Sequence, residues 1–286
     1  MRSTLVLAVV LLIAAFLTFR THGDGTPHRE RGAGIERADL GEAPSGSRHG
    51  RERASGGSTG DCADRYLGGR IPTMPTVQTR GATTLCFEAF ASLSSPATRT
   101  PLWAAEALTP VAMEEARRTE RVSEFHAEPA LAGEDRAELS DYRRSGYDRG
   151  HLAPSADMPG YEAQQQSFTL ANIVPQAGDL NRGSWADLEG DVRSLARRRD
   201  VVYVVTGVLF EGSVRRTPSG RVMVPTGMWK AVASPGEGAA VLTASNDDEP
   251  VWRTDTVAAF VRRTGIDPFP ALEPQDRDRL LRIGGR

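Results

Sequence analysis

Residues 147–154 of this chain read YDRGHLAP, and this short polar stretch beside glycine and proline decides the fold assignment. It contains His151, one of two histidines that lie beyond residue 60. Histidine can act as a general base near neutral pH. Asp148 and Arg149 lie beside it but do not distinguish a catalytic histidine from a structural one. The stretch therefore has to be interpreted together with the polar residues that follow it.

Asn181 is the next informative residue, because it lies just before a segment with helical periodicity. Apolar residues recur at helical spacing over residues 184–199, which predicts a helix there. Asn181 can cap such a helix at its N-terminus. Its amide oxygen can equally bind a hard cation such as Mg²⁺, which keeps most of its waters and needs few protein ligands. Both interpretations stay open at this point.

Glu189 and Arg193 lie four positions apart, so they share one face of the predicted helix. They can form an ordinary surface ion pair. Alternatively, the carboxylate can bind metal-bound water while the guanidinium binds a phosphate. Together with His151 and Asn181, they make up the residue set that metal-assisted phosphodiester hydrolysis requires.

The coarse pattern of elements favours an α+β fold. Strands alternate irregularly with helices and show no regular βαβ order, which disfavours a doubly wound sheet. Residues 201–210 form a continuous apolar run, which predicts a strand buried on both faces. The other predicted strands lie in 83–93, 167–174, 222–232 and 239–244, and the other predicted helices span 104–108 and 255–263.

The chain divides into three predicted parts. Residues 1–23 form a signal peptide or a retained signal anchor, because Arg2 precedes an apolar run over residues 4–19. Residues 24–60 are rich in Gly, Ser, Arg and Glu, which predicts a disordered linker. Residues 61–286 form the globular domain. We therefore expect export to the periplasm or the exterior, and membrane attachment through residues 4–19 stays open.

Cys62 and Cys86 are the only two cysteines. An even pair in an exported protein predicts a disulfide. Two free buried thiols are the alternative. Neither cysteine belongs to a C-x-x-C pair, so the sequence disfavours a zinc site.

The charge balance limits the partners of this protein. The chain has 35 basic and 37 acidic residues and a formal net charge of −2. A protein that coats nucleic acid usually has a strong positive excess, so the charge balance disfavours that class and still allows a locally basic cleft. A chain that is balanced overall but locally basic suits an enzyme that must release a polyanion. Arginines gather near the central stretch, at Arg143, Arg144, Arg149, Arg193 and residues 197–199.

These motifs, taken in order, resemble those of the DNA/RNA non-specific endonuclease family. The resemblance rests on residues 148–151 (DRGH), 167–168 (SF), 172–176 (NIVPQ), 206–207 (TG) and 99–103 (RTPLW) with Glu106, and on Asn181, Trp185, 188–189 (LE) and Arg193. It extends over about residues 62–270. The combined pattern is far more specific than DRGH alone.

The resemblance implies a ββα-metal fold, in which an antiparallel sheet is flanked by helices. It also implies a role for each matching residue. His151 would be the general base, and Asn181 the single direct ligand of Mg²⁺, with Mn²⁺ as a substitute. Glu189 would hold waters of the metal shell. Phosphate charge would be stabilised by Arg193, Arg149 and Arg121, while Asn172 would orient His151 or the substrate.

DNA and RNA are the substrates that the resemblance implies, with 5′-phosphate products and a homodimer as a further expectation. Two alternatives remain. One is a non-catalytic exported protein that binds nucleic acid on the same fold. The other is a phosphodiesterase for a small molecule, although the chain lacks the Asp/His clusters of two-metal phosphatases.

Overall fold

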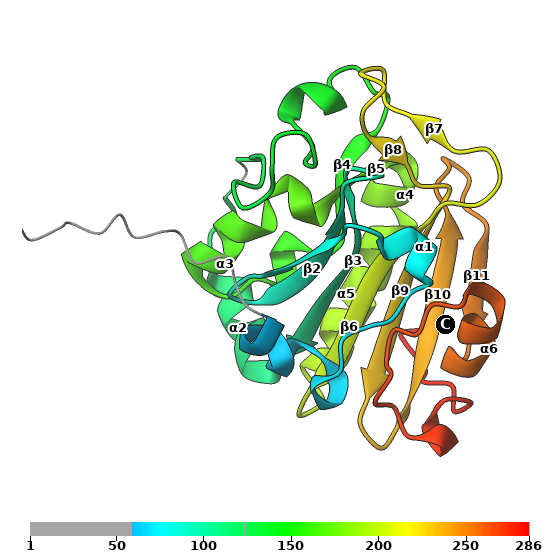
Figure 1. The fold of residues 1–286 in the computed structure, drawn as a ribbon. Coiled ribbons are helices and arrows are strands. Elements are labelled where there is room, and N and C mark those ends of the chain that lie inside the picture. Colours follow the sequence, from blue (N-terminus) through cyan, green and yellow to red (C-terminus); the bar gives the residue numbers. More distant parts are fainter. Residues whose placement is uncertain (1–58, 123, 286) are drawn as a thin grey trace, which may run out of the picture. The chain divides into compact units, whose positions relative to one another are not determined.

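A seven-stranded antiparallel sheet forms the centre of the molecule (Figure 1). The computed structural model describes residues 59–122 and 124–285. In order across the sheet, the strands are β1 (Thr83–Cys86), β2 (Phe90–Ser95), β3 (Thr100–Leu108), β6 (Val202–Leu209), β9 (Gly227–Ser234), β10 (Gly238–Ser245) and β11 (Trp252–Asp255). The predicted α+β class is therefore confirmed.

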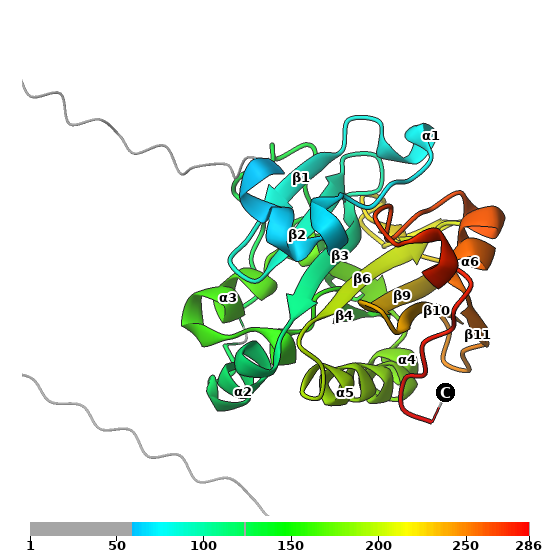
Figure 2. The ribbon, with the colours of Figure 1, turned by 90° about the horizontal axis from the view of Figure 1, so that it is seen from below.

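Helical segments cover both faces of this sheet (Figure 2). On one side lie α2 (Pro110–Arg118) and α5 (Ser184–Ala196). On the other lie the 3-10 helix η1 (Thr59–Arg65) and α6 (Val257–Thr264). The remaining α-helices are α1 (Thr76–Thr79), α3 (Gly160–Ser167) and α4 (Gly178–Arg182).

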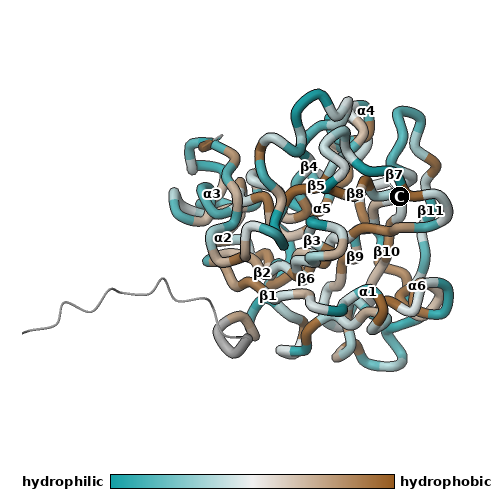
Figure 3. The backbone as a smooth tube through the Cα atoms, turned by 45° about the horizontal axis from the view of Figure 1, so that its top comes forward, coloured by the Kyte–Doolittle hydropathy of each residue, from teal (hydrophilic) through white to brown (hydrophobic). Residues whose placement is uncertain are grey.

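Alternate residues of the middle strands pack into two separate hydrophobic cores, one on each side of the sheet. In β6, Val204 and Val208 pack under α5, while Val205 packs toward α6. This alternation is what a pleated strand with two buried faces produces. The prediction of a strand buried on both faces is thus confirmed. Figure 3 shows that hydrophobic residues are concentrated in the central strands.

The helix that we predicted over residues 104–108 is wrong, because these residues belong to β3. Alanine favours helices in isolation, but small residues also fit a strand that is packed on both sides. Trp103 and Ala105 enter one core and Ala104 enters the other. The predicted strand over 167–174 is largely wrong as well, since α3 and a 3-10 turn at Leu170–Asn172 precede β5 (Ile173–Gln176).

A small two-stranded sheet lies beside the main one. It pairs β4 (Asp148–His151) with β5 in antiparallel register, so that His151 lies opposite Ile173. A further pair joins β7 (Arg215–Arg216) to β8 (Met223–Val224). The β4–β5 pair and helix α5, which follows the short helix α4, form a β-β-α unit.

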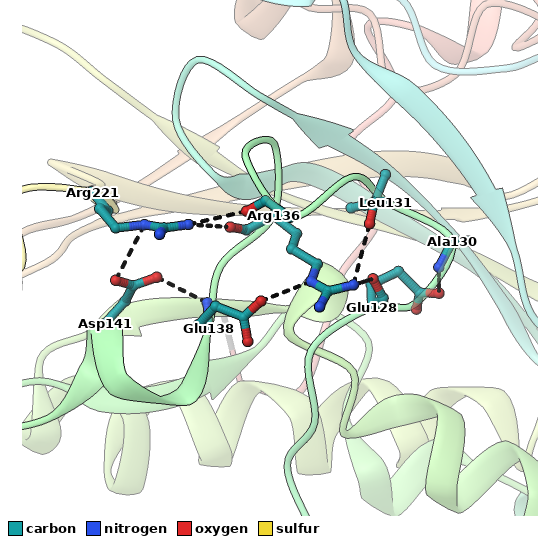
Figure 4. A network of polar contacts seen from close by, with 8 residues as sticks. Glu128, Ala130, Leu131, Arg136, Glu138, Asp141 and Arg221 are labelled. Carbon is teal, nitrogen blue, oxygen red and sulfur yellow. Dashed lines mark hydrogen bonds and ion pairs between the residues drawn. The ribbon is translucent and has the colours of Figure 1, made fainter.

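The long segment between α2 and β4 is held by polar contacts (Figure 4). Arg136 pairs with Glu138 at 2.8 Å, and Arg221 pairs with Asp141 at 3.5 Å. The Asp141 carboxylate also accepts the backbone N–H of Glu138 at 2.8 Å. These contacts fix the segment that leads into β4.

The predicted disulfide is present and joins Cys62 of η1 to Cys86 of β1. Cys62 is fully buried in the core beneath α6. The predicted signal segment and nearly all of the predicted linker lie outside the described residues. Within residues 59–285, as far as they are described, no helix is long and apolar enough to cross a membrane.

Candidate active site

Strand β4 carries the DRGH motif, and its glycine is required by close packing. Gly150 lies opposite Val174 in the β4–β5 ladder. A Cβ atom at this position would lie 2.0 Å from the side-chain oxygen Oε1 of Gln176. Any larger residue would push the two strands apart and displace His151, the next residue along the chain.

His151 is held between two aromatic rings. Its ring contacts Phe168 edge-on at 4.8 Å between centroids and Phe125 at 5.6 Å. Its Nε2 atom is buried and has no hydrogen-bond partner among the described residues. Burial, and then the nearby positive charge of Arg121, lower the pKa of His151 to about 3. The imidazole is therefore neutral at ordinary pH.

Asn172 lies behind His151 and not beside the substrate space. It is fully buried, and its Oδ1 accepts the backbone N–H of Ala153 at 2.9 Å. Its Nδ2 donates to the carbonyl oxygens of Ala153 at 2.8 Å and Ser167 at 2.9 Å. The amide is fully used by the backbone, so of the two expected roles only the positioning of His151 fits.

A polar hollow of about 280 Å³, the central hollow, brings most of the predicted site residues together. Its lining includes His151, Asn181, Glu189, Arg121 and Arg149. Asn172 and Arg193 do not line it, and Arg193 instead lines an adjoining hollow.

Two of the three arginines that line the central hollow, Arg121 and Arg149, stack on the aromatic rings that hold His151. The guanidinium of Arg149 lies 4.2 Å from the centroid of the Phe125 ring. That of Arg121 lies 5.4 Å from the centroid of the Phe168 ring. Stacking of a planar guanidinium on an aromatic face orients it while its donors stay free. Phe125 and Phe168 therefore position the histidine and both arginines at once.

Asn181 is not a helix N-cap, because it lies within the short helix α4 and Gly183 separates it from α5. Its Nδ2 donates to Oδ2 of Asp148 at 3.0 Å, and Arg182 pairs with the same carboxylate oxygen. The amide nitrogen is thus occupied, which leaves Oδ1 as the atom that can bind a cation. The sequence analysis had not predicted that the Asp148 carboxylate holds Asn181 and Arg182 in place.

The donor set fits a hard cation bound by few protein ligands. No group of three or more His, Cys, Asp or Glu side chains among the described residues could hold a metal ion. Asn181 contributes a neutral oxygen, and Glu189 lies in the same hollow and can bind metal-bound water. Such sparse oxygen ligation is typical of Mg²⁺ sites.

Arg193 pairs with Asp157 at 3.0 Å, although Glu189 lies one helical turn away. Asp157 is 4% exposed and follows the central stretch. The buried carboxylate of Asp157 therefore holds the guanidinium of Arg193 in place. Sequence reasoning missed Asp157, because nothing in the local pattern distinguishes it from a solvent-exposed loop aspartate.

Buried charges lie beneath the site, inside the sheet. Glu106 of β3 and Lys230 of β9 are each only 1% exposed. Lys230 donates from Nζ to Oγ1 of Thr206 at 2.5 Å, and its Nζ lies 5.5 Å from the centroid of the Trp185 ring. Lys230 is the only lysine of the chain. Its position in the middle of an apolar strand was the signal from which a buried charge could have been predicted.

Burial changes the acidity of the carboxyl groups around this lysine. Desolvation is the largest cause of a raised pKa in Glu106, Asp157 and Glu189, and it brings the pKa of Glu189 to about 7. Lys230 acts in the opposite direction on each of them. The lysine therefore helps to keep negative charge available at the bottom of the site.

The β4–β5 pair and α5, arranged around a hollow with one histidine and one amide oxygen, define the ββα-metal fold class. The chain belongs to the DNA/RNA non-specific endonuclease family, whose model matches residues 69–275. The resemblance found in the sequence is thus confirmed over most of the globular domain.

Individual relatives agree with this assignment. Bovine mitochondrial endonuclease G is 35% identical over 158 residues, which cover 54% of this chain and 48% of the relative. The mitochondrial nuclease of Saccharomyces cerevisiae is 40% identical over 226 residues, or 68% of each chain. The matched part thus spans about half the length of the bovine relative. In the solved EndoG/EndoGI complex, a chain with 22% identity has the same fold, with a TM-score of 0.59 over 78% of this chain and 96% of that one.

Proposed function

We propose that this protein is a metal-dependent endonuclease that hydrolyses phosphodiester bonds in DNA and RNA with little sequence preference. One observation carries the proposal: the central hollow joins a neutral histidine, a free amide oxygen, a carboxylate and arginines. This is the set that phosphodiester hydrolysis needs. Membership of the endonuclease family supports the same reaction class.

His151 is the proposed general base. Its Nε2 is buried, so in this ring orientation Nδ1 is the nitrogen left to accept a proton from water. The water oxygen bonds to phosphorus in line with the leaving O3′, and the P–O3′ bond breaks. The O3′ then takes a proton from solvent, which gives 5′-phosphate and 3′-hydroxyl ends.

The low pKa of His151 fits this role once substrate is bound. Arg121 contributes to the low value, and a phosphate anion beside Arg121 would offset its charge. Binding of substrate would therefore raise the basicity of the histidine when it is needed. Arg121 and Arg149 would at the same time stabilise the negative charge that grows on the phosphate oxygens.

We propose Mg²⁺ as the metal, with Mn²⁺ as a substitute. Asn181 would bind it through Oδ1, and Glu189 would hold part of its water shell. When bound, such a cation stabilises charge on the phosphate and on the leaving oxygen. Arg193, fixed by Asp157, would add positive charge at the rim of the central hollow.

A plasmid-nicking assay of the purified full chain tests this function. We expect cleavage with Mg²⁺ and none with a chelator. His151→Ala should lose about 100-fold or more in rate, as expected for loss of a general base. His126→Ala is the matched control, because His126 is exposed and lies outside the central hollow, and it should cleave like the wild type.

The outcomes separate the candidate functions. Metal-independent cleavage, or a His151→Ala variant as active as the wild type, would overturn the mechanism. Binding of DNA without cleavage would instead indicate a non-catalytic binding protein. Turnover of a nitrophenyl phosphodiester but not of plasmid would indicate a small-molecule phosphodiesterase.

We further propose that the protein is exported through residues 1–23. The Cys62–Cys86 disulfide supports this, because such bonds persist mainly in oxidising compartments. The homodimer and the membrane attachment through residues 4–19 stay predictions from the sequence.

A further inference from the structure

A second hollow of about 300 Å³, the side hollow, adjoins the central hollow. The two share Arg121, Ser155 and Ala156 as wall residues, so they are continuous. The side hollow lies between α2, which contributes Arg117, and the C-terminal end of α5, where Arg197 follows the helix.

The lining of the side hollow is strongly basic. It contains Arg117, Arg121, Arg193 and Arg197 and no carboxylate. Arg117 and Arg193 are balanced by Glu114 and Asp157. Arg121 and Arg197 form no ion pair with any described residue. An arginine-lined hollow without acidic groups is suited to bind an anion such as phosphate.

Two buried polar residues form the floor of the side hollow. Ser155 is 5% exposed and Gln164 is 2% exposed, and the side-chain amide of Gln164 donates to the carbonyl oxygen of Ser155. Arg197 lies on the rim, where its guanidinium donates to Oγ of Ser194 at 3.1 Å. The arginines of the side hollow therefore surround buried, hydrogen-bonded polar groups, which favours a defined position for an anion.

The other neighbours of the central hollow are less suited to a polyanion. A hollow on the far side of Phe125 is lined by Glu124 and Glu162 and would repel phosphate. A third neighbour shares Arg149 with the central hollow but also contains Asp148. Of these three neighbours, the side hollow alone is lined by arginines without acidic residues.

We propose that the side hollow binds a backbone phosphate adjacent to the scissile one, with Arg197 as its outer ligand and Arg121 shared between both phosphates. The identity of the ligand, a DNA or RNA strand, rests on the proposed function. Contacts to phosphate raise affinity without selecting sequence. The substrate strand then runs from the central hollow into the gap between α2 and α5.

Binding of a fluorescent oligonucleotide to the full chain in chelator, followed by anisotropy at several salt concentrations, tests this subsite without any need for cleavage. Arg197→Glu should weaken binding about tenfold and reduce the salt dependence by about one phosphate contact. Arg197→Lys should bind within about twofold of the wild type, because it keeps the charge. Arg197→Gln should fall between the two.

Arg198→Glu is the matched control, since it makes the same charge change at the next residue, which is exposed and outside the side hollow. It should weaken binding by less than about twofold. Equal weakening by Arg197→Glu and Arg198→Glu, or an unchanged salt dependence, would overturn the subsite. A wild type that does not bind the oligonucleotide would also overturn it.

Failure of the proposed function has a different signature. A wild type that binds the oligonucleotide through Arg197 but does not cleave it after Mg²⁺ is added would contradict the nuclease proposal and leave the phosphate subsite in place.

Discussion

The two faces of the central sheet are built by the same strands but carry different chemistry. Strand β3 directs Trp103 into the core beneath α6 and Glu106 toward the side of α5. Strand β9 likewise directs Trp229 to the α6 side and Lys230 to the α5 side. The α6 face is an apolar core closed by a disulfide, whereas the α5 face contains buried charges directly below the central hollow.

This difference shows how the protein separates stability from chemistry. Burial of a charge is costly unless it is paired, so such groups are rare in a core that serves packing alone. Lys230 and Thr206 are direct cross-strand neighbours, and both lie on the side of the sheet that faces α5. On the α6 side the buried charge of Asp255 is instead paired at 2.8 Å with Arg263 of α6, at the edge of the sheet.

The largest expected contrast comes from matched substitutions on the two faces. Lys230→Met should lower the free energy of unfolding by about 1–3 kcal/mol, because the buried Thr206 hydroxyl loses its hydrogen-bond partner and the nearby carboxyl groups lose a favourable charge. Phe260→Ala, in the core beneath α6, should cost about 3–5 kcal/mol through the cavity that it creates. Only Lys230→Met should also lower cleavage per folded molecule, as measured by denaturant unfolding together with nicking rates.

A second substitution sharpens this test. Glu106→Gln combined with Lys230→Met should recover part of the lost stability, because fewer charges are then left unpaired. A Phe260→Ala protein that is folded but loses cleavage as severely as Lys230→Met would contradict the division of roles between the two faces.

The disulfide should give the next largest effect, and on stability alone. Replacement of Cys62 and Cys86 by alanine should lower the free energy of unfolding by about 2–4 kcal/mol, since the crosslink restricts the unfolded chain. Nicking rates at a temperature where both proteins are folded should be unchanged. A folded double variant without activity would place the disulfide in the site, contrary to the structure.

The smallest effect is a pH dependence confined to the α5 face. The pKa of His151 is lowered to about 3 in the folded protein, while the unfolded chain has the ordinary value near 6.5. Between these values only the unfolded state takes up the proton. His151 therefore contributes stability above about pH 6.5 that is lost as the pH falls toward about 3, by up to about 1.4 kcal/mol per pH unit.

Denaturant unfolding of chelated wild type and His151→Ala at pH 7, 6 and 5 measures this contribution. The wild type should lose more stability on acidification than the variant does. Parallel pH profiles for the two proteins would show that the histidine is not desolvated in the folded state.

The sequence was sufficient to predict the main polar residues of the central hollow, but not the residues that hold them in position. His151, Asn181, Glu189, Arg121 and Arg149 were identified because their chemistry and order match a known pattern. For Asn172 the sequence left two roles open, orientation of His151 or of the substrate, since an asparagine that binds only backbone has the same local sequence signal as one that binds a ligand.

The missed residues act through tertiary contacts. Asp157 contacts Arg193, Lys230 contacts Thr206 and Phe168 contacts His151, and the two residues of each pair lie far apart in the sequence. The wrong helix over residues 104–108 has a related cause, because burial on both sides of a sheet overrides the helical preference of alanine. Local patterns thus predicted residues that line the central hollow, while the contacts that position them required the folded chain.

The most direct test of the account is the rate of plasmid cleavage as a function of Mg²⁺ concentration for wild type and Asn181→Ala, with Arg262→Ala as a control. Arg262 is exposed on α6, on the opposite face. We expect the wild type and Arg262→Ala to share one Mg²⁺ dependence, and Asn181→Ala to need far more Mg²⁺ or to remain inactive while folded. An Asn181→Ala protein with the wild-type Mg²⁺ dependence would contradict a metal-dependent site on the α5 face.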